Sequence, residues 1–469
     1  MLGVVRIYNT LTRRVEEVAP LEDRRIRMYT CGPTVYRYAH LGNLRTFLLA
    51  DLLRRALEFE GYEVFQVMNI TDVGHMTDES SPRAVDKMLL AAEDEGLSPL
   101  EIAEKYTKAF LEDAAAVGMQ PAHVYPRATE HIPEMIELTQ RLIERGHAYV
   151  VDDGTVYYDV RSFPGYGKLS GNTLDKLRPG HRDLETDPRK RHHADFSLWK
   201  AAGPGRVMKW PSPWGEGFPG WHIECSAMSM KYLGERFDLH TGGVDLIFPH
   251  HEDEIAQSEG ATGHQVVSTW VHGGHLRLAG QKIAKSAGNV VRVHELVDRG
   301  FDPRSYRYLT FQTRYRSEMD FSWEAMAAAD EHVKRLRRRM AEWREAPRPA
   351  ELTEAGRAYD RRFREAVADD LDMPEALVVL NELVKNPDVA FGEKYALLCS
   401  WDRVLGLDLE REAREGFEVP PEVQALLEER DAARRRRDFA TSDAIRARLV
   451  EMGFEVQDTA AGTVVRPRS

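Results

Sequence analysis

The chain has 469 residues, a length that at about 100 to 200 residues per domain indicates roughly three domains. Hydrophobic residues make up 42% of the sequence and charged residues 30%, a balance that is typical of a folded globular protein and excludes an intrinsically disordered chain. The formal net charge of -12 excludes a general, sequence-blind binder of polyanions, although local basic patches still allow a nucleic-acid partner.

The sequence carries no recognisable signal for a membrane or for secretion. It has no window of about 18 uncharged apolar residues, so we expect no transmembrane helix. Residues 1–8 lack the basic and apolar segments of a secretory signal, and we expect a cytoplasmic protein. Three cysteines are too few and too scattered for a disulfide framework. Cys31 and Cys225 are candidates for metal ligation, whereas Cys399 lies on an apolar helical stretch and is expected in the core.

The first regular elements predict a strand, a helix and a second strand. Residues 24–30 alternate in polarity as a strand does, residues 44–60 have apolar side chains at helical spacing and stop before Gly61, and residues 63–70 again indicate a strand. Such a unit predicts a parallel sheet whose ligand site lies at the carboxyl ends of the strands. Residues 30–33 and 69–72 should then lie side by side.

The rest of the chain changes character twice. Residues 152–220 are irregular and rich in Gly, Pro and Trp, which indicates an insertion between two halves of one domain. Residues 408–421 indicate a linker, after which residues 422–452 are predicted to be helical and residues 453–466 to form a hairpin. Beyond residue 301 a helical bundle is predicted. Its candidate helices are 331–345, 358–369, 373–384 and 393–405.

A short polar motif lies between the first strand and the first helix. His40, Gly42 and Asn43 would stand at a helix N-terminus, where unpaired N–H groups and the helix dipole attract a phosphate. Gly42 would let a nucleotide approach the backbone, and His40 can donate a hydrogen bond to it. The alternative is that His40 is only a helix cap or a buried core histidine.

A second motif is a basic segment between glycines. Lys282, Lys285 and Ser286 are flanked by Gly280 and Gly288, which indicates a mobile loop. Two lysines and a hydroxyl suit the negative charge that builds on a polyphosphate leaving group. A solvated charged loop without such a role is the alternative.

Four residues have the chemistry of metal ligands. Pro249 indicates a helix start, and the spacing of four puts His250 and Glu254 on one face of that helix. Together with Cys31 and Cys225 they offer two thiolates, an imidazole and a carboxylate, which suit zinc. A purely structural zinc and the absence of any metal remain alternatives.

The proposed metal and phosphate sites should share one crevice, because Cys31 closes the first strand and His40 opens the following helix. His251 and Glu252 point elsewhere on the predicted helix, and we expect them to be solvated or to surround the ligands.

Two basic segments, 334–339 and 434–437, the second followed by Phe439, suit contacts with phosphates and the stacking of a base. A solvated helix face is the competing interpretation of each.

These motifs together resemble those of the cysteinyl-tRNA synthetases, a family of class I aminoacyl-tRNA synthetases. The matching stretches, in the order of the family, are 29–36, 40–43, 69–72, 220–228, 245–258 and 282–289.

Two departures from the family's pattern stand out. Ile283 and Ala284 replace the Met and Ser of the usual lysine loop, so one hydroxyl is missing. Asn43 stands where the class signature has a second His. We expect activity to survive, because asparagine can still donate a hydrogen bond and both lysines remain.

The resemblance implies an ATP-dependent ligase that joins L-cysteine to tRNA(Cys) through a cysteinyl-adenylate. It implies one Zn²⁺ per chain, which selects the thiol, and Mg²⁺ bound with ATP; we expect a monomer without a membrane partner. It assigns catalysis to His40, Asn43, Lys282 and Lys285, and it assigns zinc binding to Cys31, Cys225, His250 and Glu254. Thr71 and Trp221 would bind the amino acid. The residues that would bind ATP are Pro33, Thr34, His40, Gly42, Asn43, Gly242, Gly243, Asp245, Lys282, Lys285 and Ser286.

The expected fold is α/β: a Rossmann-like parallel-sheet catalytic domain split by an insertion, then a helical bundle and a small C-terminal α/β domain. We place the two catalytic halves at 1–150 and 221–280, the second with the zinc site, and the insertion at 151–220. The lysine-loop and stem-contact region is placed at 281–330, the helical anticodon-binding domain at 331–410 and the small tRNA-binding domain at 420–469.

Two other functions remain open. One is a ligase that makes the same adenylate but passes cysteine to an amino sugar; that family resembles this chain only up to the lysine loop, whereas residues 358–468 here indicate a tRNA-binding region. The other is a non-catalytic zinc module that binds RNA. The joint presence of His40, Lys282 and Lys285 counts against it.

Overall fold

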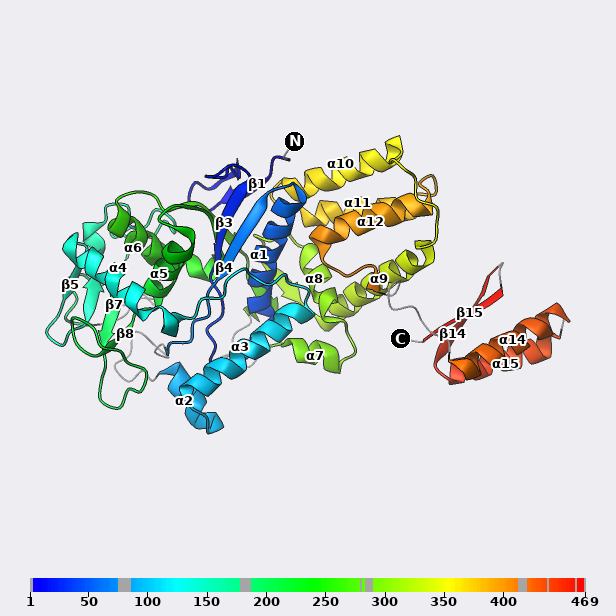
Figure 1. Ribbon diagram of the computed structural model, residues 1–469, viewed down its shortest axis with the longest axis horizontal. Coiled ribbons are helices and arrows are strands. Elements are labelled where there is room, and N and C mark those ends of the chain that lie inside the picture. The colour runs from blue at the N-terminus through cyan, green and yellow to red at the C-terminus, as the bar shows by residue number, and fades with distance from the viewer. Residues whose placement is uncertain are drawn as a thin grey trace. The chain divides into compact units, whose positions relative to one another are not determined.

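A parallel sheet of four strands forms the centre of the larger part of the chain. Helix α1 (Leu41–Phe59) joins two of these strands, β3 and β4, and Figure 1 shows the three elements beside one another. The predicted α/β fold with a parallel sheet is therefore confirmed, although the helix begins at Leu41 rather than at residue 44. In spatial order the strands are β10 (Val267–Gly273), β9 (Phe237–Gly243), β3 (Arg25–Thr30) and β4 (Glu63–Met68).

The chain divides into two compact units. One comprises Met1–Arg335 and Glu345–Leu409, and the other Leu336–Arg344 and Glu410–Ser469. The computed structural model describes residues 3–74, 86–177, 187–278, 281–282, 290–411, 420–436, 438–459 and 462–467.

The ends of β3 and β4 lie side by side, as predicted. The backbone N–H of Gly32 donates to Asn69 Oδ1 at 2.9 Å, and the N–H of Thr71 donates to the carbonyl of Pro33 at 3.0 Å. A side chain at position 32 would place its Cβ 1.8 Å from the carbonyl oxygen of Asn69. Only glycine therefore allows the two strand ends to approach this closely.

The insertion is more regular than predicted. Its strands β6 (Val156–Tyr158), β7 (Phe196–Ala201) and β8 (Gly217–Pro219) form one antiparallel sheet with β5 (Ala148–Val150), the strand just before the insertion, in the order β5, β6, β7, β8. Three of these strands have only 3 residues, and a register shift interrupts the pairing of β6 with β7. Such short runs show no measurable alternation of polarity, so the sequence pattern indicated irregular structure instead.

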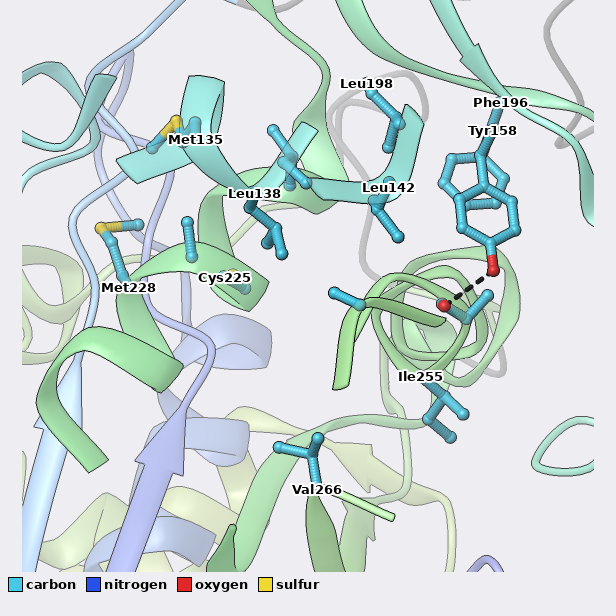
Figure 2. Packing of buried hydrophobic residues seen from close by; sticks show 14 of the residues in the cluster. Met135, Leu138, Leu142, Tyr158, Phe196, Leu198, Cys225, Met228, Ile255 and Val266 are labelled. Atoms are coloured by element: carbon cyan, nitrogen blue, oxygen red, sulfur yellow. Dashed lines mark hydrogen bonds between the residues drawn. The ribbon is translucent and has the colours of Figure 1, made fainter. Parts of the chain in front are cut away.

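A hydrophobic cluster joins the insertion sheet to three helices, α4 (Ile132–Glu144), α5 (Trp221–Leu233) and α6 (Glu252–Thr262). Figure 2 shows Leu138 of α4 near Cys225 of α5, and the hydroxyl of Tyr158 donating to the carbonyl of Ala256 in α6 at 2.8 Å. The helices that carry Cys225 and Glu254 are therefore held by packing on a common core.

Helices dominate the remainder of the larger unit. The predicted bundle is present, but its first helix begins at Trp323 rather than at residue 331. Cys399 is half-buried, so its expected place in the core is wrong. The described helices are α2 (Lys87–Glu95), α3 (Pro99–Ala116), α7 (Val293–Asp298), α8 (Pro303–Phe311), α9 (Trp323–Trp343), α10 (Glu354–Ala368), α11 (Met373–Lys385) and α12 (Phe391–Leu405). Of these, α9 belongs to the larger unit only up to Arg335.

Two small sheets complete this unit. One is the hairpin of β1 (Arg6–Asn9) and β2 (Arg14–Glu17). The other has the order β12 (Gln281–Lys282), β11 (Leu276–Leu278) and β13 (Met319–Phe321). In the second sheet β12, which contains Lys282, pairs with β11, the strand that follows β10 in the chain.

The smaller unit has its own core. Helices α14 (Pro421–Arg435) and α15 (Phe439–Glu451) pack on the antiparallel hairpin of β14 (Phe454–Thr459) and β15 (Gly462–Pro467). The hairpin was predicted, but the helical segment is two helices rather than one. The residues of this core are Val423, Leu426, Leu427, Ile445, Leu449, Val456 and Val465.

A buried ion pair connects the central sheet's helix to the helical bundle. Arg307 of α8 contacts Asp51 of α1 at 2.5 Å and donates to the carbonyl of Leu405 at the end of α12. Arg55 also donates to Asp51, at 2.7 Å. Burial opposes the charge on Asp51, but Arg307 and Arg55 hold its pKa below the usual value.

Replacing Asp51 with alanine should reduce the free energy of unfolding by about 3 to 5 kcal/mol, because the Arg307 charge would be left buried without its partner. Since the folded-state pKa of Asp51 is lowered, this contribution is complete above the unfolded-state value near 3.8 and is lost as the pH falls through the folded-state value. Denaturant unfolding between pH 7 and pH 3 measures both effects. The exposed Asp23→Ala is the control, and an equal cost for the two variants would contradict the assignment.

Candidate active site

A cavity of about 400 Å³ lies at the carboxyl edge of the parallel sheet. Cys31 and Trp221 line one part of it, and His40, Gly42 and Asn43 line another. Further described lining residues come from the ends of β9 and β10, and include Gly243, Asp245, Leu246, Gly273, Gly274, His275 and Leu276. The structure thus brings the predicted metal ligand Cys31 and the predicted phosphate-binding residues to one cavity.

The start of α1 is held by a reciprocal pair of hydrogen bonds. The backbone N–H of Asn43 donates to His40 Nδ1, and the backbone N–H of His40 donates to Asn43 Oδ1, both at 3.2 Å. This capping box explains why the helix begins earlier than its apolar pattern indicated. Both capping residues also line the cavity, so the cap leaves them at the cavity wall.

The lysine segment is only partly described. Lys282 ends β12, where its backbone pairs with that of Arg277 in β11. Lys285, Ser286, Ile283 and Ala284 lie outside the described residues. Just beyond them, the carbonyl of Val291 accepts from the N–H of Leu41 at 2.9 Å, so the segment that follows the lysines contacts the first residue of α1.

Four metal-type side chains meet beside Cys31. The ligand atoms of Cys31, Cys225, His250 and Glu254 all lie within 4.8 Å of one another, and all four residues are buried. The two sulfur atoms are 3.7 Å apart, and His250 Nε2 is 3.0 Å from Glu254 Oε1. Cys31 follows β3, Cys225 lies on α5, and the other two flank the start of α6. The cluster is therefore assembled from three separate segments, and its ligand atoms lie close enough together that they could hold a metal ion.

Glu254 and His250 stabilise each other's charged forms in the buried cluster. Burial alone would raise the pKa of Glu254, but His240 and His250 lower it to about 2. Burial likewise opposes the charge on His250, yet Glu254 and Cys225 raise its pKa to about 10. The hydrogen bond from Cys31 lowers the pKa of the Cys225 thiol, whereas burial raises that of Cys31. The carboxylate of Glu254 is thus held in its charged form, and the thiol of Cys225 loses its proton more readily than that of Cys31.

His251 lies against the same cluster, so of the two expectations for it, solvated or surrounding the ligands, the structure bears out the second. Its Nε2 lies 3.3 Å from the sulfur of Cys31, and its Nδ1 lies 2.7 Å from His272 Nε2. With Cys31, His240 and Glu254 it forms a second set of possible ligands. The solvated alternative is excluded because residues 252–258 of α6 are buried on all sides. Glu252 is also buried; its carboxylate accepts from the N–H of Ser170 at 2.7 Å.

The two residues predicted to bind the amino acid lie in different surroundings. Trp221, the first residue of α5, lines the cavity, with its ring centroid 4.4 Å from that of His250. Thr71 is buried, and it is not among the described residues that line the cavity. Its hydroxyl donates to Glu224 Oε2 at 2.9 Å and accepts from Asn69 at 3.0 Å. Burial raises the pKa of Glu224 well above its usual value.

Replacing Thr71 with valine should therefore cost about 1 to 3 kcal/mol of unfolding free energy, because it leaves the buried Glu224 carboxyl without this donor. Denaturant unfolding measures the loss. Thr71→Ser keeps the hydroxyl and should cost less than Thr71→Val; equal costs would mean that the methyl group, not the hydrogen bond, matters.

Some of the residues predicted to bind adenosine and phosphates line the cavity, and Gly242 is not among the described lining residues. Pro33, Thr34, Gly243 and Asp245 line the cavity. Gly242 is buried at the end of β9, where a Cβ would lie 2.5 Å from the ring of His251. The absence of a side chain at this position leaves room for the ring of His251.

The two basic segments show mixed surroundings. Lys334 forms an ion pair with Asp330 at 2.9 Å, whereas the ring of Phe439 is largely exposed. Arg437 lies outside the described residues.

Among the helices that the structure describes, none combines the length and the apolar character needed to cross a bilayer.

Comparisons with known proteins give a consistent result over the whole chain. A family model for the class I (C) tRNA synthetase catalytic domain matches residues 17–331, and one for the cysteinyl-tRNA ligase anticodon-binding domain matches residues 418–466. A "Cysteine--tRNA ligase" of Thermus thermophilus is 46% identical over 98% of both chains. That of Treponema denticola is 41% identical over 98% of this chain and 99% of its own.

A likeness in fold extends to a more distant solved structure. Mycobacterium tuberculosis methionyl-tRNA synthetase in complex with methionyl-adenylate aligns with a TM-score of 0.56 at 17% identity. The alignment covers 83% of this chain and 92% of that one.

Proposed function

The chain belongs to the cysteinyl-tRNA synthetase family, and on that premise we propose that its cavity activates L-cysteine with ATP and passes it to tRNA. One observation carries the assignment to this cavity: it extends from Cys31 and Trp221, beside the four metal-type ligands, to His40 and Asn43 at the start of α1. An amino-acid thiol beside Cys31 and a nucleotide phosphate beside His40 would therefore lie in the same cavity.

In the first step the carboxylate of cysteine attacks the α-phosphorus of ATP. The bond from that phosphorus to the bridging oxygen breaks, and pyrophosphate leaves with the electron pair. No side chain acts as the nucleophile. His40, Lys282 and Lys285 would stabilise the charge that develops on the phosphates, together with the N–H groups at the start of α1.

In the second step a terminal ribose hydroxyl of tRNA attacks the carbonyl carbon of the adenylate. The new ester forms as the bond from the carbonyl carbon to the phosphate oxygen breaks; AMP leaves with that electron pair, and its phosphate takes up the proton of the hydroxyl. The side chains that line the cavity hold the reactants in line during both steps. Gly243, Asp245, Pro33 and Thr34 would hold the nucleotide, and Gly242 would act indirectly, by admitting His251.

The donor set fits zinc. Two thiols, an imidazole and a carboxylate are typical zinc ligands, and the four residues Cys31, Cys225, His250 and Glu254 already lie within the required space. Zinc held there would supply strong affinity for thiolate, which the hydroxyl of serine lacks. Mg²⁺ would enter with ATP rather than through a dedicated protein site. Trp221 would cover the amino acid on the side of His250.

The full set of partners in this proposal is ATP, L-cysteine and tRNA(Cys), and the proposed compartment is the cytoplasm, where these three are found together. We propose a monomer. The rival amino-sugar ligase is disfavoured because residues 418–466 match an anticodon-binding domain, and a non-catalytic RNA-binding module is disfavoured because a catalytic-domain model matches residues 17–331.

Aminoacylation by the purified protein tests the function. With ATP and tRNA, labelled cysteine should become attached to tRNA as an alkali-labile ester, and serine should be attached at least about 10⁴ times less efficiently. Formation of the adenylate without any esterified tRNA would favour the amino-sugar ligase. Absence of cysteine-dependent exchange between pyrophosphate and ATP would leave only the binding module.

A further inference from the structure

One arginine of α1 binds three backbone carbonyls where the central sheet passes into the small sheet of β11, β12 and β13. Arg45 Nη1 donates to the carbonyl of Gly274 at 2.8 Å and to that of His275 at 2.5 Å, and its Nη2 donates to the carbonyl of Ser317 at 2.6 Å. Gly274 and His275 connect β10 to β11, whereas Ser317 precedes β13. A single side chain therefore ties the starts of two strands to α1.

The backbone that accepts these hydrogen bonds is closely packed. The N–H of Gly274 donates to the carbonyl of Tyr315 at 2.8 Å, and the N–H of Met319 donates to the carbonyl of His275 at 3.0 Å. A side chain at position 274 would place its Cβ 2.4 Å from the carbonyl oxygen of Ser317. Three carbonyl oxygens from two segments thus converge on one point, and the planar fork of N–H groups on a guanidinium can satisfy all of them.

The surroundings of Arg45 differ from those of the arginines that follow it on α1. Arg45 is buried, and its described hydrogen bonds all go to backbone carbonyls. Arg54 instead pairs with the carboxylate of Glu58, and Arg55 with that of Asp51. Burial lowers the pKa of the Arg45 guanidinium below its ordinary value, so holding a cation at this position costs free energy. This cost favours a role for Arg45 beyond the stability of the helix.

The segments that Arg45 joins carry the two parts of the proposed phosphate site. Asn43, at the start of α1, and Leu276, at the start of β11, both line the cavity. A Cβ built at Gly42 would lie 3.8 Å from the Cβ of Leu276, so the two segments are neighbours in the cavity wall. From there β11 pairs with β12, which ends at Lys282. The contacts of Arg45 thus help to set the distance between the start of α1 and the backbone that carries the lysine.

We propose that Arg45 is a positioning residue for adenylate formation, which keeps the strand that leads to Lys282 in register with the start of α1. It is not among the described residues that line the cavity, so it acts through the peptide groups it binds. The proposal rests on the proposed function, because only a reaction at the phosphates of ATP requires both segments at once. A displacement of about 1 Å between such groups can slow a reaction about 10²-fold.

Two substitutions of Arg45 and one matched control test this role. Arg45→Met keeps an unbranched side chain but removes every donor, whereas Arg45→Lys keeps the charge and loses the fork. Arg54→Met is the control, since Arg54 is also buried on α1 and donates to a backbone carbonyl, that of Pro121 at 2.8 Å, but is not among the described lining residues. For each protein three quantities are measured: the single-turnover rate of adenylate formation with saturating substrates, the KM for cysteine in pyrophosphate exchange, and the temperature of unfolding.

Arg45→Met should form the adenylate about 10² times more slowly than the wild type. Its KM for cysteine should not change, because Arg45 makes no described hydrogen bond to the residues of the metal-type cluster. Arg45→Lys should recover part of the rate, to within about tenfold of the wild type. Arg54→Met should unfold at a lower temperature and keep the wild-type rate.

Three results would overturn the proposal. One is a wild-type rate in folded Arg45→Met. Another is a KM for cysteine that rises as far as the rate falls, which would indicate a general distortion of the sheet edge. The third is an equally slow Arg54→Met, which would mean that any lost arginine on α1 has this effect. If Arg45→Met does not fold, Arg45→Lys carries the test, and a wild-type rate in that variant would refute the role of Arg45.

The wild type separates this proposal from the function on which it rests. Absence of cysteine-dependent exchange in the wild type would refute the proposed function itself. Normal exchange in the wild type, together with wild-type rates in both Arg45 variants, would refute only the positioning role.

Discussion

Replacing Cys31 with serine is expected to abolish the preference for cysteine over serine, which in the wild type should reach about 10⁴. Cys31 belongs to both possible ligand sets of the buried cluster and also lines the cavity, so no other arrangement of the described ligands compensates for its loss. Serine is close in size but binds zinc poorly. Zinc content by elemental analysis and exchange of pyrophosphate into ATP with each amino acid measure the two effects.

Cys399→Ser is the matched control, because it makes the same chemical change on α12, away from the cluster. It should keep both the metal and the preference. A Cys31→Ser protein that still discriminates against serine by several orders of magnitude would show that selection does not depend on this cluster.

Replacing His40 with alanine should slow adenylate formation by about 10² to 10³, the usual cost of losing one hydrogen-bond donor at a site of developing charge. The same change also removes the cap of α1 and should lower stability by about 1 kcal/mol. Single-turnover adenylate formation and thermal unfolding measure the two effects separately.

His40→Asn separates the cap from the chemistry. Asparagine is a good cap residue but has a shorter side chain than histidine, so this variant should recover stability while remaining slow. Full recovery of the rate together with stability would mean that His40 acts only by starting the helix.

The strand, helix and strand at the start of the chain could be predicted because each has a strong local pattern. Their positions also placed Cys31 and His40 at the same edge of the sheet, where the structure has them lining one cavity. The helix start was missed by the apolar pattern, since it depends on the hydrogen bonds between His40 and Asn43. The sequence does contain these capping residues, so this signal was available.

Other features had no local signal. The strands of the insertion are short and pair with partners far along the chain, as β7 does with β6 across residues 159–195. The sequence left open whether His251 is solvated or lies next to the ligands, because helical spacing alone does not show that α6 and the residue before it are packed on all sides. Lys87, Tyr106 and Arg292 line one cavity because three segments that are distant in the sequence meet in the fold. No spacing within the sequence reveals such a meeting.

The most direct test of the account is X-ray absorption at the zinc edge of the purified enzyme, before and after L-cysteine is added. If the thiol of the amino acid is recognised by zinc in the cluster of Cys31, Cys225, His250 and Glu254, the sulfur neighbours at about 2.3 Å should increase from two to three. Serine should leave the spectrum unchanged. A sulfur count that stays at two when cysteine saturates the enzyme would contradict selection of the thiol by the metal.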